Sequence, residues 1–237
     1  MTPHPPVTFT REGFTRGLRA SPALVLGGVP FGIVTGLTAQ AHGLSLAEAT
    51  LMSFFAFAGS AQLLALGAWT TPVHFLPVNL TALTVNLRFL LMGPLLAPWL
   101  DRLHGWRRWL SLFFMIDHNW ALSLKEMQAG RNDAAYLIGS GIPIWIAWVL
   151  LTMAGHVLGS VVAAPPGHPV FFAALSVFIA LLVPMWRGRI DLVPWLAAAA
   201  VAFGVSRLLP GTTWHIVAGA VGGGLCGALR DRLNRSA

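Results

Sequence analysis

Two side chains of opposite charge interrupt long apolar stretches of this sequence. Arg88 lies in LTVNLRFLLMG (residues 83–93), and Asp117 lies in WLSLFFMIDHNWALSL (residues 109–124). An ionised side chain at the centre of a membrane helix costs about 2.5–3.5 kcal/mol, so neither is expected to stand unpaired. We therefore predict an ion pair between them. Such a pair is either structural or part of a site in which Arg88 binds a carboxylate and Asp117 binds an amine or a proton.

The neighbouring apolar stretches supply further polar positions and positions where a helix can break. Gln62 lies three residues after Gly59, and its amide can either hold a zwitterion or bridge two helices. Asn86 lies two residues before Arg88. A proline inside a helix frees backbone groups, and transporters often bind ligands at such broken helices. The candidate breaks or hinges are Pro30, Pro77 and Pro94.

The composition indicates the solvent in which these residues lie. Of the 237 residues, 56% are hydrophobic and only 10% are charged. A soluble domain carries about 25% charged residues, so this chain has too few charges to cover a surface that faces water. Several apolar runs approach the roughly 20 residues that cross a bilayer as a helix. We predict an integral membrane protein.

Eight apolar segments can be marked along the chain. They cover residues 21–41, 49–69, 73–100, 109–124, 134–162, 170–186, 191–209 and 214–229. We predict an all-α, polytopic membrane helix bundle with six to eight hydrophobic segments, some of them broken or re-entrant. If all eight segments span, the basic stretch at 101–108 falls outside the cell. If the third and fourth segments re-enter instead, every basic cluster is cytoplasmic and six spans remain. The sequence leaves both topologies open.

Basic clusters lie between the apolar segments and account for the net charge of +7. This placement is typical of the cytoplasmic ends of membrane helices, whereas nucleic-acid binding needs a basic face interleaved with aromatic residues. We predict a cytoplasmic N-terminal segment (1–19), a single transmembrane domain (20–230) and a basic cytoplasmic tail (231–237). Both termini are expected in the cytoplasm of a multi-pass protein of the cell inner membrane.

Two pairs of short matches suggest a possible internal repeat. GVPFG at 28–32 is similar to GIPIW at 141–145, and NLRFLL at 86–91 is similar to GVSRLL at 204–209. Transporters often arise from such repeats, with the substrate site between them. Three glycines spaced four residues apart also predict a tight helix contact, either within the chain or with another chain. They are Gly219, Gly223 and Gly227.

An enzyme, a metal site or a bound cofactor is not indicated. Ser140 and His156 could suggest an intramembrane serine protease, but Ser140 has no supporting motif. The histidines are scattered singly along the chain, which does not indicate a metal site. Cys226 is the only cysteine and is expected to be packed and inert.

Three motifs in order carry a resemblance to a known family. The stretch at 30–66, PFGIVTGLTAQAHGLSLAEATLMSFFAFAGSAQLLAL, is followed at 85–98 by VNLRFLLMGPLLAP. Together they resemble the AzlC family, the large subunit of branched-chain amino-acid exporters, and the resemblance extends from about residue 14 to residue 232. It implies a secondary transporter of the inner membrane that works with a small AzlD-like membrane subunit. It also implies proton-coupled export of leucine, isoleucine, valine or similar large neutral amino acids.

The resemblance also assigns site residues by position. Those that match the polar signature of the family are Gly59, Gln62, Asn86, Arg88 and Asp117. Two positions depart from the family pattern: Phe89 replaces a common histidine, and His118 replaces a common glutamate. Because an unperturbed histidine titrates near pH 6.5, we expect Asp117 and His118 to carry the proton coupling.

Two functional hypotheses follow from the sequence. In the first, the chain is a transporter subunit that exports neutral amino acids across the membrane. In the second, it is a non-transporting membrane scaffold in which Arg88 and Asp117 form only a structural ion pair.

Overall fold

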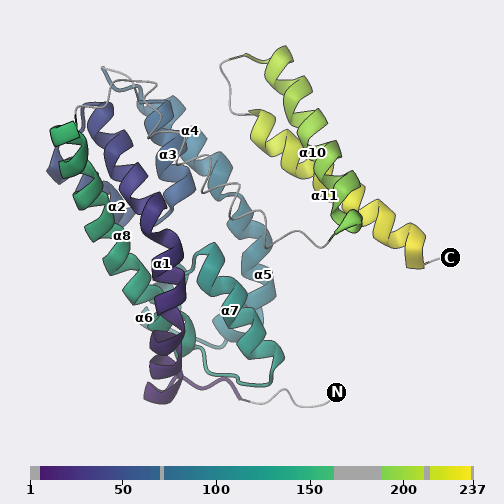
Figure 1. The fold of residues 1–237 in the computed structure, drawn as a ribbon. Coiled ribbons are helices and arrows are strands. Elements are labelled where there is room, and N and C mark those ends of the chain that lie inside the picture. The colour runs from purple at the N-terminus through teal and green to yellow at the C-terminus, as the bar shows by residue number, and fades with distance from the viewer. Residues whose placement is uncertain (1–5, 70–71, 163–187, 211–213, 236–237) are drawn as a thin grey trace.

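The computed structural model describes residues 6–69, 72–162, 188–210 and 214–235, which fold mainly into helices (Figure 1). The helices are α1 (Arg11–Ala41), α2 (Leu46–Phe55), α3 (Gly59–Gly67), α4 (Phe75–Asn86), α5 (Arg88–Leu100), α6 (Trp106–Phe113), α7 (Asp117–Gln128), α8 (Ala135–Val162), α10 (Arg189–Leu208) and α11 (Trp214–Arg235). Among the described residues, α1, α8 and α10 are long and apolar enough to cross a membrane, and the bent pair α4–α5 is a fourth candidate. The all-α prediction is confirmed. The predicted segment 170–186 lies outside the described residues.

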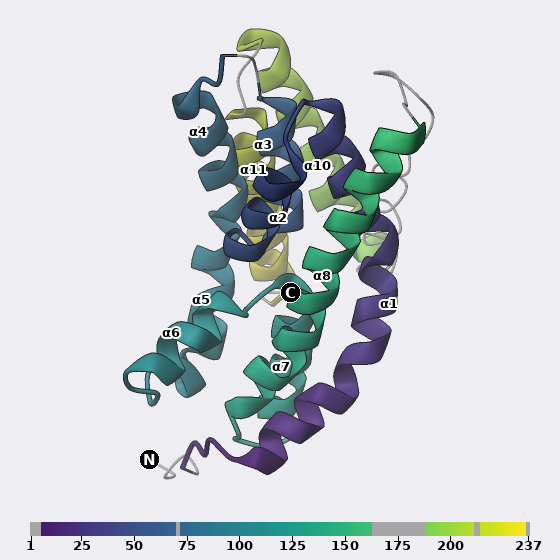
Figure 2. The same ribbon diagram turned by 90° about the vertical axis from the view of Figure 1, so that its left-hand side faces the viewer.

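The centre of the fold is the parallel pair α1 and α8, which lie side by side in both views (Figures 1 and 2). Thr8 and Asp133 form a parallel β-bridge just before the two helices, so both helices start at the same end. The Asp133 carboxylate accepts hydrogen bonds from the backbone N–H of Thr10 (3.2 Å) and of Ala135 (3.1 Å). The N-cap of α1 is Thr10, whose hydroxyl accepts from the backbone N–H of Gly13 at 3.2 Å, so α1 starts at Arg11, well before the apolar run itself.

Four glycines let α1 and α8 approach until their backbones touch. They are Gly17 and Gly36 on α1 and Gly139 and Gly155 on α8. A Cβ added at any of them would lie 2.0–2.2 Å from a carbonyl oxygen of the facing helix. The oxygens facing Gly36 and Gly155 belong to Thr152 and Ile33, each three residues before the opposite glycine. The contact is therefore reciprocal, which gives α1 and α8 a local two-fold relation.

Helices α2 and α3 form a re-entrant hairpin rather than one spanning helix. Both ends of the hairpin pack near the C-terminal end of α1, where Ala49 of α2 and Leu66 of α3 share a buried cluster with Ala39 and Leu44. The chain reverses at residues 56–58, which are not helical. The segment predicted at 49–69 thus enters and leaves at the same end.

Helices α6 and α7 form a second hairpin that enters from the opposite end. Trp106, at the start of α6, packs its ring 6.1 Å from that of Phe9, and Met127, near the end of α7, packs beside Tyr136. The chain reverses at residues 114–116. Figure 2 shows α2 and α3 beside the upper half of α8 and α6 and α7 beside its lower half. The two tips meet in one buried cluster that includes Phe57 and Phe114.

The third predicted segment, 73–100, crosses in two parts instead of re-entering. Its parts, Phe75–Leu90 and Met92–Leu100, are bent by 57°, and α4 ends at Asn86 with Leu87 as its C-cap. The far end of α5 reaches the start of α8, where Leu100 packs with Leu137. The sequence left re-entry open for the third and fourth predicted segments, 73–100 and 109–124. The fourth does re-enter, but the other re-entrant segment is the second, 49–69, and not the third. One charged residue, Arg88, begins α5 directly after Leu87 and lies just before the bend.

The three prolines expected as breaks lie inside helices that continue through or past them. Pro77 is in the first turn of α4, where a backbone N–H has no acceptor within the helix, so a proline there removes no hydrogen bond. Pro30 lies within α1 and Pro94 within α5. The interruption between α4 and α5 falls at Leu87, the 57° bend lies between Leu90 and Met92, and a hinge motion at the prolines stays a prediction.

Helices α10 and α11 form a separate hairpin that touches the rest of the described chain through α4 (Figure 1). The predicted glycine stripe faces α10: a Cβ on Gly219 would lie 2.9 Å from Cβ of Ala202, and one on Gly223 would lie 2.7 Å from Cβ of Ala198. The stripe therefore serves a contact within the chain. The predicted boundaries of the transmembrane domain, at 19/20 and 230/231, both fall inside helices: the first inside α1 and the second inside α11.

Candidate functional site

A cavity of about 80 Å³ lies where the two hairpin tips, the start of α5 and the pair α1–α8 meet. Its lining includes Phe31, Gly59, Ser60, Arg88, Asp117, His118 and Trp148. Sites that hold drug-sized ligands measure about 300–1,000 Å³. A ligand much larger than a few water molecules therefore requires this lining to move apart.

The predicted ion pair is present at the cavity. Nη1 of Arg88 lies 2.9 Å from Oδ2 of Asp117, and the side chains are 33% and 46% exposed in the isolated chain. The Arg88 guanidinium carbon also lies 5.3 Å from the ring centroid of Phe89. The pair joins the bent span to the second hairpin while remaining accessible from the cavity.

Two helices of opposite hairpins begin at the cavity. Helix α7 begins with Asp117 itself, so a carboxylate stands at its N-terminus. Helix α3 begins at Gly59, with no acidic residue in its first turn and no side-chain cap within the described part of the chain. The first N–H groups of a helix lack intrahelical partners and carry a partial positive charge. One of the two positive helix ends is therefore neutralised, and the other is not.

Gly59 places the start of α3 directly against the aromatic rings of Phe31 and Trp148, which form one wall of the cavity. A Cβ at this position would lie 2.4 Å from Cη2 of Trp148 and 2.6 Å from Cε1 of Phe31. Ser60, the next residue, is only 8% exposed, and its buried hydroxyl has no hydrogen-bond partner among the described residues. A polar group of this kind usually finds a partner when it is buried.

Gln62 lies one turn behind the cavity, in a buried hydrogen-bond network. Its Oε1 accepts from Nε1 of Trp148 (2.9 Å), and its Nε2 donates to Oγ of Ser53 (2.9 Å). Ser53 in turn donates to Oγ1 of Thr152 at 2.9 Å. Of the two uses considered for this amide, the structure therefore places it between helices, and it holds Trp148 against the cavity.

Asn86 faces a different cavity, of about 360 Å³, on the other side of the first hairpin tip. Phe57 lines both cavities, and its ring centroid lies 6.5 Å from that of Phe113. The structure thus brings Gly59, Arg88, Asp117 and His118 together, while Asn86 and Gln62 lie just outside the cavity that these residues share.

Several buried residues of the site were not singled out from the sequence as candidates. They are Ser60, Asn119, Trp148 and Thr152. Asn119 accepts from the backbone N–H of Ile116 (2.9 Å) and donates to the carbonyls of Phe114 (2.7 Å) and Leu137 (3.3 Å). It thereby joins the second hairpin tip to α8. Its position two residues after Asp117 was the available signal.

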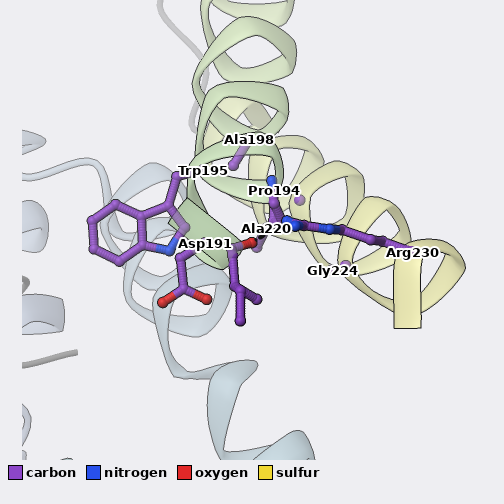
Figure 3. A pocket seen from close by; sticks show the side chains of 10 residues that line it. Asp191, Pro194, Trp195, Ala198, Ala220, Gly224 and Arg230 are labelled. Carbon is purple, nitrogen blue, oxygen red and sulfur yellow. Dashed lines mark hydrogen bonds between the residues drawn. The ribbon is translucent and has the colours of Figure 1, made fainter. Parts of the chain in front are cut away.

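A further cavity, of about 340 Å³, lies between α10 and α11 and contains none of the predicted site residues. Figure 3 shows Asp191 and Trp195 on one side of it and Arg230 of α11 reaching across to α10 on the other. The Arg230 guanidinium donates to the carbonyl of Ile190. Within the described part of the chain, no group of three or more His, Cys, Asp or Glu side chains could hold a metal ion.

Several membrane-spanning helices with hairpins that enter from both ends define a multi-pass membrane protein. Comparison with known proteins agrees: the chain is 28% identical over 218 residues to an uncharacterized membrane protein of Archaeoglobus fulgidus, covering 90% of this chain and 93% of the relative. It is 23% identical over 164 residues to an uncharacterized membrane protein of Haemophilus influenzae, covering 69% and 67%. No solved structure matches the chain significantly.

The family model described as AzlC protein matches residues 23–162, more than half of the chain. The chain belongs to the AzlC family, whose members are generally transporters rather than enzymes. The matched region contains α2 to α7, and with them both re-entrant hairpins and the Arg88–Asp117 pair.

Proposed function

We propose that this protein is the large subunit of a secondary transporter for branched-chain or other large neutral amino acids. The observation that carries the proposal is the cavity between the hairpin tips, where an ion pair and two helix N-termini face an apolar wall. A neutral amino acid has one negative group, one positive group and an apolar side chain. Helix ends that meet at the middle of a membrane protein are common sites for such substrates.

Within this site, Asp117 is assigned the substrate ammonium group. Arg88 contacts Oδ2 of Asp117, which leaves the second carboxylate oxygen for a further donor. Phe31 and Trp148 supply apolar surface for the substrate side chain. Gly59 keeps that wall close, and Gln62 holds the Trp148 ring in place. Asn86 is assigned to the neighbouring cavity, on the path by which substrate reaches the site.

We assign proton coupling to Asp117 and His118, both of which line the cavity. Transport would be outward, and the complete transporter would include a small AzlD-like subunit; both assignments rest on the family. A His118→Gln variant tests the coupling. We expect it to retain exchange of leucine but to lose the pH dependence of net efflux, and an unchanged pH dependence would contradict the role of His118.

The protein is assigned to the cell inner membrane with its basic end in the cytoplasm. The loops at 101–105 and 129–134 lie at the end where α1 begins, together with Arg11 and Arg16. Basic residues concentrate at cytoplasmic ends. Because Cys226 is the only cysteine, Cys226→Ser gives a cysteine-free background. In it, Arg131→Cys should react with a membrane-impermeant maleimide only after cell lysis, and Ala47→Cys, at the opposite end, should react in intact cells.

Counterflow in reconstituted vesicles tests the function itself. The full chain is reconstituted with and without the small subunit, and uptake of labelled leucine, isoleucine, valine and methionine is measured against an internal pool of the same amino acid. We expect exchange for at least one of them and none for glutamate or lysine. An absence of exchange in both preparations would favour the scaffold hypothesis.

A further inference from the structure

We propose that Ser60 and the first backbone N–H groups of α3 bind the carboxylate of the substrate. This inference rests on the amino-acid transport proposed above and deepens it by assigning the anionic half of the site. It adds a second anchor beside Arg88, the residue first expected to bind the carboxylate.

The first argument is the uncompensated start of α3. The N-terminal turn of a helix presents several backbone N–H groups and a partial positive charge, which together favour an anion. In α7 this charge faces the carboxylate of Asp117, the first residue of that helix. In α3 neither an acidic residue nor a capping side chain is present within the described part of the chain, although Ala58, Gly59 and Ser60 all line the cavity.

The second argument is independent of the helix end and comes from the Ser60 hydroxyl. The side chain is more than nine-tenths buried, and its oxygen has no partner among the residues that the structure describes. A buried hydroxyl that lacks a partner is unfavourable. Since Ser60 lines the cavity, a ligand acceptor there would satisfy the hydroxyl in the same geometry that satisfies the helix end.

The third argument concerns Arg88, the other candidate for the carboxylate. Its Nη1 is held by Asp117 at 2.9 Å, which leaves its buried Nε, without a partner among the described residues, to donate to the substrate carboxylate. A substrate held between the two hairpins then adds its carboxylate to α3 and its ammonium to Asp117. Each charge then meets an opposite one, and the Arg88–Asp117 pair stays intact.

Binding of leucine to the full chain in lipid nanodiscs tests this assignment. We expect Ser60→Ala to weaken leucine binding roughly tenfold to a hundredfold, since it removes a hydrogen bond to a charged group. Ser60→Asp places a carboxylate of the chain at the same helix end, which tolerates it, and we expect leucine binding to be lost. Both variants should bind 3-methylbutylamine, which is leucine without its carboxylate, as the wild-type chain does.

Ser111→Ala is the matched control. Ser111 is also fully buried, and its hydroxyl also lacks a partner in the described part of the chain, but it lies on α6 away from the cavity lining. We expect wild-type leucine affinity for this variant, and the thermal midpoint of each variant confirms its fold. If wild type transports leucine and the two Ser60 variants bind leucine as wild type does, the carboxylate assignment is overturned and the proposed function stands. If the wild-type chain neither binds nor transports any neutral amino acid, both are overturned.

Discussion

The hairpins α2–α3 and α6–α7 enter from opposite ends and meet at their tips, but they differ in the charge at the start of their second helix. Helix α7 begins with Asp117, which Arg88 contacts, whereas α3 begins with the uncharged pair Gly59 and Ser60. The chain itself thus supplies the negative charge at the start of the second helix of the second hairpin. On the proposed assignment, the first hairpin receives its negative charge from the substrate.

The two hairpins also differ in how they are held to α8. Asn119 holds the second hairpin through backbone groups at its tip. The first hairpin is held by the side-chain network of Ser53, Gln62, Trp148 and Thr152, and two of these residues also shape or support the cavity wall. A change in the position of Trp148 therefore reaches the first hairpin directly. On the proposed function, we therefore expect the first hairpin to respond to substrate and the second to provide a fixed frame.

Replacing Asn119 should have the largest effect on stability. Asn119→Leu removes three hydrogen bonds at a fully buried position. Hydrogen bonds within membrane proteins average about 0.6 kcal/mol, but the unpaired backbone groups left behind raise the total to about 3 kcal/mol. The measurement is the unfolding free energy in mixed micelles. Asn79→Leu is the control, because Asn79 is exposed and donates only within its own helix, to Phe75.

Reversing the charges of the ion pair should have the next largest effect. We expect Arg88→Asp or Asp117→Arg alone to destabilise the protein by about 2 kcal/mol, less than a fully buried pair because both side chains are partly exposed. The double reversal should restore most of the stability but not transport, since an arginine then stands at the N-terminus of α7. Recovery of leucine counterflow in the double variant would mean that the pair is only structural.

The sequence predicted the ion pair and the existence of broken segments but not which segments re-enter. Arg88 and Asp117 were predictable because a membrane makes an unpaired charge unfavourable wherever it lies along the chain. The re-entry of 49–69 was not, because that run is apolar and long enough to span, and no proline marks its reversal at residues 56–58. The reversal is supported by Trp145, which donates to the carbonyl of Phe54 from 91 residues away.

Contacts between residues far apart in the sequence also limited what could be predicted about the site residues. Gly59 and His118 were singled out by the family resemblance; both line the cavity, and their roles stay predictions. For Gln62 the sequence left open whether the amide holds a zwitterion or bridges two helices, because its partner Trp148 is 86 residues distant and single-sequence patterns do not reveal such pairs. For the pairing of α1 with α8, the sequence offered only the weak similarity between residues 28–32 and 141–145. The physical basis of that pairing is the reciprocal contact of glycines with facing carbonyls, seen at Gly36 and Gly155.

Replacing Gln62 should destabilise less than replacing Asn119 but should affect transport. Gln62→Leu leaves the Trp148 N–H without its acceptor and removes the donor to Ser53, which still donates to Thr152; we expect this to cost about 1.5 kcal/mol. Because the Trp148 ring is then released, the affinity for leucine should also fall, unlike in a variant of equal stability elsewhere. Gln128→Leu, at the exposed end of α7, makes the same substitution away from the network and is the control. A Gln62→Leu variant with wild-type leucine affinity would contradict the link between the network and the cavity wall.

Replacing Trp145 should have the smallest effect, and a local one. In the wild-type chain the ring centroids of Trp145 and Phe54 lie 4.7 Å apart. Trp145→Phe keeps a ring beside Phe54 but removes the 2.9 Å hydrogen bond to the Phe54 carbonyl near the end of α2. We expect a global change of about 0.6 kcal/mol, with faster amide exchange confined to the last turn of α2. Trp109→Phe is the control, because Trp109 is exposed. If the first hairpin is the adaptable one, the opened turn should alter leucine exchange while the second hairpin keeps its protection; equal loss of protection in both hairpins would show that they move as one unit.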